Sequence, residues 1–492
     1  MLKSITYFQE SIAKKLEKTF IKYSSDMTKI AELVQGVTDC MVEFGLCLLA
    51  EELENYDTSV CEKNHLRSDW HVVRKEKASV LTSLGTLHYH KTWFRNKKTR
   101  AYQCFLDQAM GLSAHSRMTE DAEARILEEA VQTSYEKGGK NVSISSIEEV
   151  SRETVKNKIH ELRFPKKETY PEQKKEVEYL YIEADEDHVA LQFREKKGDV
   201  IENAYHQKNN GAIAKLIYVH EGIEKERENS HRHVLRNPYY FCRVCEGEEN
   251  KRLWDEVYEY IENTYELSKV KKIYLSADGG SWIKSGKKQI AGITYVLDEF
   301  HIKKYLRKIT RCFGKQRKEV EEELITMICK GTKKRFAERI EEIKEELWYP
   351  RGKKGIEEGK NYILKNWTSA KLRLLRESGI EGSSTEGHVS HILSDRMSSR
   401  PMGWSKKGMA KMAELRAYYY NGGDMLELVR YQKEELPKVV GNEDIIYSSS
   451  QMWREERKRR TELGQLADMK VYSIPYTQIK KIANFKAQIF GL

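Results

Sequence analysis

Apolar residues in the first 60 positions recur at the three- and four-residue spacing of amphipathic helices, which predicts two helices. The pattern then changes to alternation in VLTSLGTLHYHKTWFR, where a Leu-Gly break predicts a strand hairpin. A helical run from Met118 to Lys137 is expected to end at Gly138 and Gly139. The two helices and the hairpin are predicted to form a small accessory α+β domain at residues 1–115, and the helical run follows it.

The segment SISSIEEVSRETVKNKIHELRF has the spacing of a helix-turn-helix, and residues 116–170 are predicted to be a DNA-binding region. Ile147 and Val150 would close a first short helix, and Ser151 would cap the second. The buried stripe of the second helix would be Val155, Ile159 and Leu162. Its outer face carries residue types that contact phosphates and base edges, namely Arg152, Thr154, Lys156, Asn157 and His160. A helical hairpin with a solvated polar face is the alternative.

Strands dominate from Glu178 onwards. EYLYIEADEDHVALQFRE predicts two strands joined by an acidic bend, and AKLIYVHEGI predicts a third. The helix LWDEVYEYIENTYEL then leads to the strands KKIYLSADGG and AGITYVLDEF, a βαβ order that predicts parallel pairing. The expected fold class is an α/β RNase H-like core of three antiparallel and then parallel strands at residues 171–301 and 381–415. A helical insertion at 302–380 and a helical C-terminal region at 416–492 complete the predicted domains.

Composition adds three constraints. The net charge of +10 suits a polyanionic partner. The eight Cys are scattered, and the first residues lack the apolar stretch of a signal peptide, which favours reduced thiols and a cytoplasmic location. No window approaches the roughly 20 apolar residues of a membrane span, so the membrane is not an expected partner.

Acidic residues stand where the predicted strands end. In an RNase H-like sheet the first strand lies beside the fourth, so Asp185 and Asp278 would meet at one sheet edge although 93 positions separate them. Glu386 would follow in the first turn of a later helix capped by Ser384 or Thr385. Two magnesium ions, with manganese as a possible substitute, could be held by these carboxylates and would suit phosphodiester chemistry. Solvated turns are the alternative reading of isolated acids.

At these residues the sequence resembles the ISLre group of bacterial insertion-sequence transposases, which are related to the Mutator-like DDE transposases. The resemblance spans residues 80 to 410 and rests on TSLGTLHYHKTWFRNKKTRAYQCFLDQAMGL, YIEADEDHVALQ, IYLSADGGSWIK, LDEFHIKKYL and EGHVSHILSDRMSSRPMGWS. It implies a DDE transposase that cleaves transposon ends and transfers their 3′-hydroxyls into target DNA. Asp185, Asp278 and Glu386 would then be metal ligands, and His301, three residues after Asp298, would contact a phosphate or orient a group of the site.

Two assignments stay open at this point. Asp187 competes with Asp185 as the first ligand because strand alternation puts both on one face. Glu381 competes with Glu386 as the third acid. The expected partners are double-stranded DNA, both terminal inverted repeats and target DNA, and further copies of the chain, in a dimer or a larger assembly.

The helix after His301 has a basic face with no acid in its sequence, IKKYLRKITRCFGKQRK. The cations predicted to hold DNA phosphates are Lys303, Lys304, Arg307, Lys308 and Arg311. Trp282 and Trp404 could stack on an unpaired base, although core packing is the more common role. Cys242 and Cys245 have a zinc-like spacing near His231 and His233, with buried thiols as the default. REERKRR near Arg457 is read as a solvated helix.

Two other functions fit the same pattern. The chain could be a catalytically inactive helix-turn-helix protein derived from a transposase, which would bind DNA equally well in EDTA. It could also be an RNase H-like nuclease that hydrolyses nucleic acid without strand transfer.

Overall fold

The computed structural model describes residues 3–433, apart from 63–67, 113–115, 145–148, 167–169, 194–209, 291, 346–349, 377–378 and 401. The chain forms two compact units that each combine distant segments. The first unit takes its described residues from 1–168, 189–212 and 394–436, and the second from 169–188 and 213–393. REERKRR and the rest of the C-terminal region beyond residue 433 lie outside the described residues.

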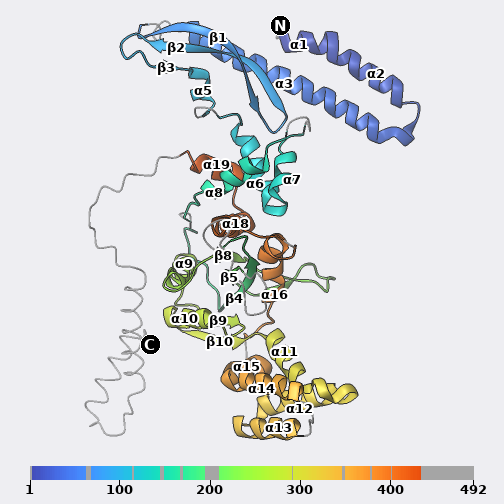
Figure 1. Ribbon diagram of the computed structural model, residues 1–492, viewed down its shortest axis with the longest axis vertical. Helices are drawn as coiled ribbons and strands as arrows, with labels where there is room; N and C mark the ends of the chain where they lie inside the picture. Colours follow the sequence, from blue (N-terminus) through green and yellow to red (C-terminus); the bar gives the residue numbers. More distant parts are fainter. Residues whose placement is uncertain are drawn as a thin grey trace. The chain divides into compact units, whose positions relative to one another are not determined.

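The first unit begins with a helical hairpin. Helices α1 (Lys3–Tyr7), η1 (Phe8–Ile12) and α2 (Ala13–Tyr23) follow one another directly, and η2 (Met27–Lys29) leads into α3 (Ile30–Glu62). The strands β1 (Trp70–Leu81), β2 (Thr86–Asn96) and β3 (Tyr102–Gln103) form an antiparallel sheet along α3, followed by α5 (Phe105–Ala109) (Figure 1). The predicted helices and strand hairpin are both confirmed.

Met27–Glu62 is also long and apolar enough to cross a membrane by length and composition alone, and few residues of its apolar window are buried. The sequence pattern predicts no such segment. The difference arises because an averaged hydropathy tolerates Asp39 and Glu43, which interrupt the continuous apolar run. One helix of this kind is weak evidence of a membrane span, because core helices of soluble proteins and signal sequences meet the same criteria.

The rest of the first unit is helical. It contains α6 (Glu120–Gln132), α7 (Tyr135–Lys140), α8 (Arg152–Glu161), α17 (Asp395–Met397), α18 (Lys406–Tyr420) and α19 (Met425–Tyr431). Ser151 caps α8 by accepting a hydrogen bond from the backbone N–H of Thr154, and the predicted stripe of Val155, Ile159 and Leu162 is buried, so this helix is confirmed.

Two local expectations around α8 were wrong or fall outside the description. Gly138 and Gly139 lie inside α7 rather than ending a helix. Glycine is needed at position 139 because a Cβ there would stand 2.0 Å from the carbonyl oxygen of Val150. Glycine therefore serves close packing here and not termination. Val150 is not helical, and its N–H donates to the carbonyl of Gly139 (3.0 Å). Ile147 lies outside the described residues.

The second unit is a mixed α/β structure around a five-stranded sheet. Its strands are β4 (Tyr179–Ala190), β5 (Gly211–His220), β8 (Tyr239–Arg243), β9 (Lys272–Ala277) and β10 (Ile293–Leu297), in the order β10-β9-β4-β5-β8. β9 pairs in parallel with both β4 and β10, and β5 pairs antiparallel with β8. The expected adjacency of the first strand and the fourth is confirmed. The remaining elements are the hairpin β6 (Ile223–Lys225) and β7 (His233–Leu235), α9 (Glu249–Thr264) and α10 (Ser281–Gln289).

The strand prediction was wrong at two places. The acidic segment around Asp185 does not bend, because β4 is one continuous strand whose acids Glu183, Asp185 and Asp187 alternate onto a single face. The acids were read as a turn because acidic residues are common in turns, but here the chain stays in the sheet through the acidic segment. A further strand of the sheet is β8, which contains Cys242. This segment was considered only as a possible zinc site with Cys245 and was not predicted to be a strand.

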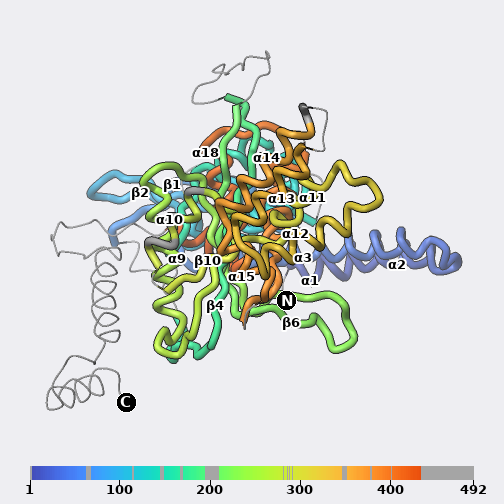
Figure 2. Tube along the Cα trace, turned by 90° about the horizontal axis from the view of Figure 1, so that it is seen from below, coloured from blue at the N-terminus to red at the C-terminus, as the bar shows by residue number. Residues whose placement is uncertain are grey.

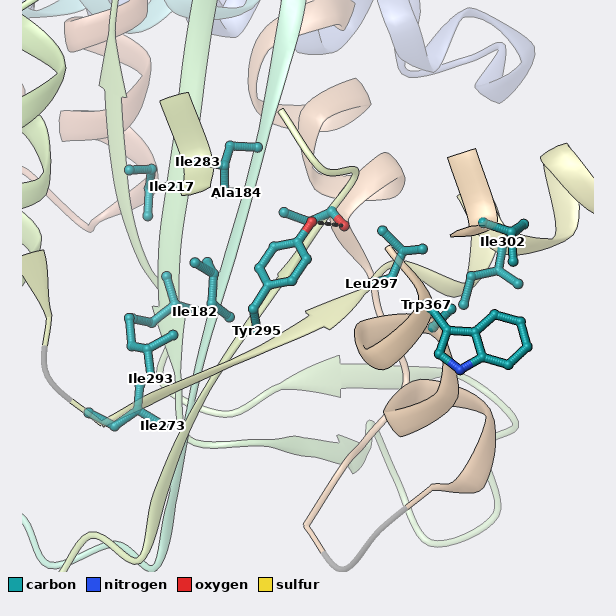
Figure 3. Close-up of a cluster of buried hydrophobic side chains, with 14 of the residues drawn as sticks. Ile182, Ala184, Ile217, Ile273, Ile283, Ile293, Tyr295, Leu297, Ile302 and Trp367 are labelled. Atoms are coloured by element: carbon teal, nitrogen blue, oxygen red, sulfur yellow. Dashed lines mark hydrogen bonds between the residues drawn. The ribbon is translucent and has the colours of Figure 1, made fainter. Parts of the chain in front are cut away.

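The region between β10 and the last elements of this unit is helical, as predicted. It comprises α11 (Glu299–Thr310), η3 (Arg311–Gln316), α12 (Arg317–Lys330), α13 (Lys333–Glu345), α14 (Pro350–Lys365) and α15 (Trp367–Leu375). Buried side chains of these helices join those of the sheet in one hydrophobic cluster. Figure 3 shows Ile182 and Ala184 of β4 and Leu297 of β10 in this cluster with Ile302 of α11 and Trp367 of α15. The short helices α16 (Thr385–Val389) and η4 (Ser390–Ser394) then follow.

Candidate functional site

Three carboxylates follow the last paired residues of three adjacent parallel strands. Ala277, at the end of β9, pairs with Ala184 of β4 and with Leu297 of β10. The next residue on each strand is an acid, namely Asp278, Asp185 and Asp298. The N–H of Asp298 donates to the carbonyl of Ala277 (3.0 Å), which extends the pairing of β10 with β9 in the same register. The parallel pairing therefore brings these acids to one edge of the sheet.

Asp185 is 9% exposed, and its Oδ1 accepts a hydrogen bond from the N–H of Glu186 (2.8 Å). Burial raises the pKa of Asp185 to about 7, the Glu186 hydrogen bond opposes this, and the charges of Asp278 and Glu386 raise it further. His301 also acts on this carboxyl, in the lowering direction. Asp278, Glu386 and His301 thus all lie within electrostatic range of Asp185 although they are far apart in sequence.

The structure separates the two candidates for the third acid. Glu386 is exposed in the first turn of α16 and its charge acts on Asp185. Glu381 instead accepts a hydrogen bond from the N–H of Ile223 at the start of β6 (2.6 Å). The expected side-chain cap of α16 was wrong: Ser384 stands at the N-cap, but its hydroxyl lies 3.1 Å from that of Tyr218.

His301 lies in the first turns of α11 beside Asp298, with its Nδ1 3.3 Å from Oδ2 of that carboxylate. Burial would lower the pKa of His301, but the hydrogen bond and charge of Asp298, with the charges of Asp278 and Asp185, raise it overall. Asp298 also caps α11 by accepting from the N–H of Phe300 (3.2 Å). The imidazole is therefore held in place at the acidic edge and biased towards its charged form.

The donor chemistry at this edge suits a hard cation. All three carboxylates offer oxygen ligands, and among the described residues none of Asp185, Asp278 and Glu386 forms an ion pair. The raised pKa of Asp185 reflects its burial first, and the negative charges of Asp278 and Glu386 add to the effect. The carboxylates do not form a closed cage, since no group of three or more His, Cys, Asp or Glu within the described ranges is placed to hold a metal.

Glu183 is a site residue that the sequence analysis missed. It lies two positions before Asp185 on the same face of β4 and is 2% exposed. Its carboxylate accepts hydrogen bonds from the hydroxyls of Tyr218 (2.6 Å), Ser383 (3.2 Å) and Thr385, and from the N–H of Ser384 (3.1 Å). The available signal was the alternation of acids along an otherwise apolar strand.

His220 of β5 completes the surroundings of Glu183, with its Nε2 3.4 Å from Oε1 of the carboxylate. Burial alone would raise the pKa of Glu183, but the hydrogen bond and charge of His220 and the hydroxyls of Thr385 and Tyr218 lower it to about 2. Glu183 is thus a buried anion that ties the turn at 383–385, and hence the start of α16, to the sheet.

Arg373 of α15 holds the neighbouring segments together. Its guanidinium donates to the carbonyl of Leu297 in β10 (3.0 Å), to the hydroxyl of Ser276 in β9 (2.6 Å) and to the carbonyl of Glu381. The Arg373 side chain is almost fully buried. One side chain therefore connects two strand ends with the approach to α16.

The predicted DNA-contacting side chains lie on helix surfaces. All five cations of the basic face are exposed, but Lys303 pairs with Glu299 (2.6 Å) and Lys308 with Glu358 (3.1 Å), so acids from outside the basic sequence offset part of it. On α8, Arg152 and Asn157 are exposed, while Thr154 and Lys156 are half-buried and interact with Ser151 and Glu153. His160 is also half-buried.

The remaining candidates are packed. The indole N–H of Trp282 donates to Glu186 (2.6 Å), and the ammonium of Lys215 lies 5.1 Å from the ring centroid. Trp404 is buried, and its indole N–H donates to the carbonyl of Met397 (3.0 Å). Cys242 and Cys245 are buried thiols outside any disulfide bond, whereas His231 and His233 are exposed.

A family model matches residues 24–435, the greater part of the chain. The chain belongs to UPF0236, an uncharacterised protein family. A UPF0236 protein of Caldanaerobacter subterraneus subsp. tengcongensis is 35% identical over 407 residues, which cover 83% of this chain and 77% of the relative. A second UPF0236 protein from this organism is 34% identical over 416 residues, which cover 85% of this chain and 82% of the relative, and its name joins eleven locus designations.

Among solved structures, the Drosophila P element transposase strand transfer complex is similar with a TM-score of 0.21 and 10% sequence identity, over 75% of this chain and 90% of that chain. The score is too low to show a shared fold, so the site of this UPF0236 protein has to be interpreted from its own residues.

Proposed function

We propose that this protein is a DNA transposase with an RNase H-like catalytic core, which cleaves transposon ends and joins their 3′-hydroxyls to target DNA. The observation that carries the proposal is that Asp185 and Asp278 follow the paired ends of the neighbouring strands β4 and β9, while the charges of Asp278 and Glu386 both act on the buried Asp185. Acids of this kind at strand ends, with no cation paired to them among the described residues, support a site for metal-assisted phosphoryl transfer.

Asp185, Asp278 and Glu386 would hold two magnesium ions, which when bound would stabilise the charge on the attacking and leaving oxygens of the phosphodiester. Asp185 would be the first ligand in preference to Asp187, because Asp185 is buried and the charges of Asp278 and Glu386 act on its carboxyl group. Since the carboxylates alone form no closed cage, phosphate oxygens of the substrate would complete the coordination. His301, biased towards its charged form by Asp298, would contact a phosphate of the DNA.

The genomic distribution of one relative gives separate support. Its name joins eleven loci of one organism, which is expected for a gene that inserts copies of itself. DNA would be held by the outer face of α8 and by the basic face of α11, and the protein would act in the bacterial cytoplasm at the nucleoid.

The direct test is a cleavage and joining assay on oligonucleotides taken from the DNA that flanks the gene. In magnesium, the wild type is expected to nick the ends of the inverted repeats and to join a pre-cut end to a plasmid, and EDTA should stop both reactions. Asp185→Asn, Asp278→Asn and Glu386→Gln should abolish cutting and leave DNA binding intact.

Glu381→Gln is the matched control for Glu386→Gln, because its side chain is engaged by β6 rather than by the acidic edge. Equal loss of cutting in both variants would contradict the assignment of Glu386. DNA binding without any magnesium-dependent product would identify a non-catalytic protein. Cutting without joining of the pre-cut end would identify a nuclease.

A further inference from the structure

Helix α11, which begins at the acidic edge, has one buried face and one exposed face. Ile302, Leu306 and Ile309 are buried in the hydrophobic core of the second unit. The ring of Tyr305 stacks on that of Tyr362 in α14, with 3.8 Å between the centroids, and Figure 2 shows the two helices side by side. The side chains on the opposite face of α11 are therefore the ones that can meet a partner.

Phe300 stands at the start of this exposed face and is 45% exposed. Its backbone N–H donates to Asp298 (3.2 Å), the acid that follows β10. Its ring lies 5.4 Å from the ring of His301 in an edge-to-face arrangement. His301 in turn is within electrostatic range of Asp185 and Asp278. An aromatic ring with a large exposed surface thus adjoins the residues of the candidate site.

Cations continue the same face of the helix. The positions four, seven and eleven residues after Phe300 lie on its side of α11 and its extension, and they are Lys304, Arg307 and Arg311. All three are exposed, and none forms an ion pair among the described residues. The ammonium of Lys304 lies 5.9 Å from the centroid of the Phe300 ring. These four residues form one surface, the Phe300 stripe, with the ring at its active-site end.

The composition of the Phe300 stripe identifies its partner. Three cations without a paired acid favour a polyanion. A fully paired duplex would offer them phosphates, but its bases are stacked on one another and leave no face for the ring. A DNA strand with an unpaired end offers both phosphates for the cations and a free base face on which an aromatic side chain can stack.

We propose that the Phe300 stripe holds the unpaired end of a DNA strand at the acidic edge. Phe300 stacks on a base that has lost its partner next to the cut, and the three cations bind the phosphates that follow. Trp282 and Trp404, which the sequence suggested for stacking, are packed within the protein. The inference rests on the proposed function, because it takes the substrate to be a DNA end, and it adds a preference for ends whose terminal bases are already unpaired.

The test measures binding in EDTA, so that it does not depend on catalysis. The full-length protein is titrated by fluorescence anisotropy against two labelled oligonucleotides with the inverted-repeat end from the DNA that flanks the gene. One is fully paired, and in the other mismatches leave the terminal bases unpaired. The wild type is expected to bind the unpaired end about 5- to 100-fold more tightly. Phe300→Ala should lose this preference, and Phe300→Trp should keep it.

Two controls separate stacking from a general loss of affinity. Phe20→Ala makes the same change at a ring of similar exposure (47%) on α2, and it should keep the preference. Lys304→Ala should weaken the binding of both oligonucleotides alike, whereas Lys303→Ala should weaken it less, because Lys303 is already paired with Glu299 (2.6 Å). Circular dichroism spectra and melting temperatures equal to those of the wild type would show that the variants fold.

An abasic residue in place of the unpaired terminal base makes the test specific for stacking. It should remove the advantage of the wild type and have no further effect on Phe300→Ala. A wild type that binds both ends equally, or a preference that persists in Phe300→Ala, would overturn the inference even if the protein cuts DNA. A Phe300-dependent preference without magnesium-dependent cutting would contradict the catalytic proposal alone, and a protein that binds neither oligonucleotide would overturn both.

Discussion

The hydroxyl of Thr385 donates a hydrogen bond to the carboxylate of Glu183, and this contact joins the helix that carries Glu386 to the strand that carries Asp185. Glu183 and Asp185 are two residues apart on β4, and Thr385 and Glu386 are neighbours at the start of α16. A buried pair therefore sets the separation of two candidate metal ligands. Glu183 is a positioning residue, because it acts through Thr385 and the turn before it.

Replacing Glu183 with Gln should loosen this connection. The carboxylate accepts from four donors, whereas the amide of Gln would turn an N–H₂ group towards some of them. We expect a loss of about 2–4 kcal/mol in the free energy of unfolding and a fall of about 10- to 100-fold in the rate of DNA cutting, with DNA affinity unchanged.

Chemical denaturation and single-turnover cutting measure the two effects. Glu178→Gln is the control, because Glu178 is an exposed acid that pairs with Lys271 at the surface (2.8 Å). A Glu183→Gln protein that is less stable but cuts at the wild-type rate would contradict a positioning role.

Thr385 allows the same connection to be tested from the other side. Thr385→Val keeps the shape of the side chain but removes the hydroxyl, whereas Thr385→Ser keeps the hydroxyl. The Val variant should therefore cut DNA about 10-fold or more slowly, and the Ser variant should stay close to wild type. Magnesium titrations of both variants would show whether the loss lies in metal affinity. If the two variants behave alike, the hydroxyl has no role in placing Glu386.

The sequence predicted much of the sheet because the pairing rules for strands depend on chain order. The parallel pairing of β9 and β10 follows from their βαβ connection, and the adjacency of β4 and β9 was expected from the strand order of an RNase H-like sheet. Periodicity also located α8, since Val155 and Ile159 are buried at helical spacing.

Other features depended on contacts that one sequence does not reveal. Glu183 reads as one more acid in YIEADEDH, and its importance comes from Tyr218, His220 and Thr385, which are distant in the chain. The different surroundings of Glu386 and Glu381 could not be read from the sequence either, because Glu381 accepts a hydrogen bond from the backbone of Ile223, which is distant in the chain. The basic face of α11 looked free of acids, yet Glu358 reaches it from α14.

Asp185→Asn should stabilise the metal-free protein. Because burial raises the pKa of this acid from 3.8 to about 7 in the folded state, its contribution to stability is greatest below pH 3.8 and is lost as the pH rises to about 7. At pH 8 in EDTA, replacing the ionised carboxylate with a neutral amide should raise the free energy of unfolding by about 1–3 kcal/mol. Thermal denaturation would measure this, with Asp187→Asn as the control on the same strand face. A lower melting temperature for Asp185→Asn would contradict the burial of an uncompensated charge.

Magnesium should make the wild type more stable than Asp185→Asn, the reverse of the order expected in EDTA. A ligand that binds only the folded protein stabilises it by about 2.7 kcal/mol at a hundred times its dissociation constant. The melting temperature of the wild type is therefore expected to rise with magnesium concentration, while those of Asp185→Asn and Asp278→Asn stay nearly constant. Sodium chloride at equal ionic strength is the control for screening. A rise shared by all three proteins would show that the ion binds elsewhere.

The cations of α11 should differ in their contribution to DNA binding. Arg307 is exposed and forms no ion pair among the described residues, whereas Lys308 is already paired with Glu358. A cation that neutralises a phosphate releases a counterion, so Arg307→Ala should weaken binding and reduce the slope of log affinity against log salt by about 1. Lys308→Ala, the matched control on the next position, should change the slope less because Glu358 offsets its charge. Fluorescence anisotropy with a labelled duplex at several salt concentrations measures both slopes, and equal slopes for Arg307→Ala and the wild type would exclude this face of α11 from the DNA contact.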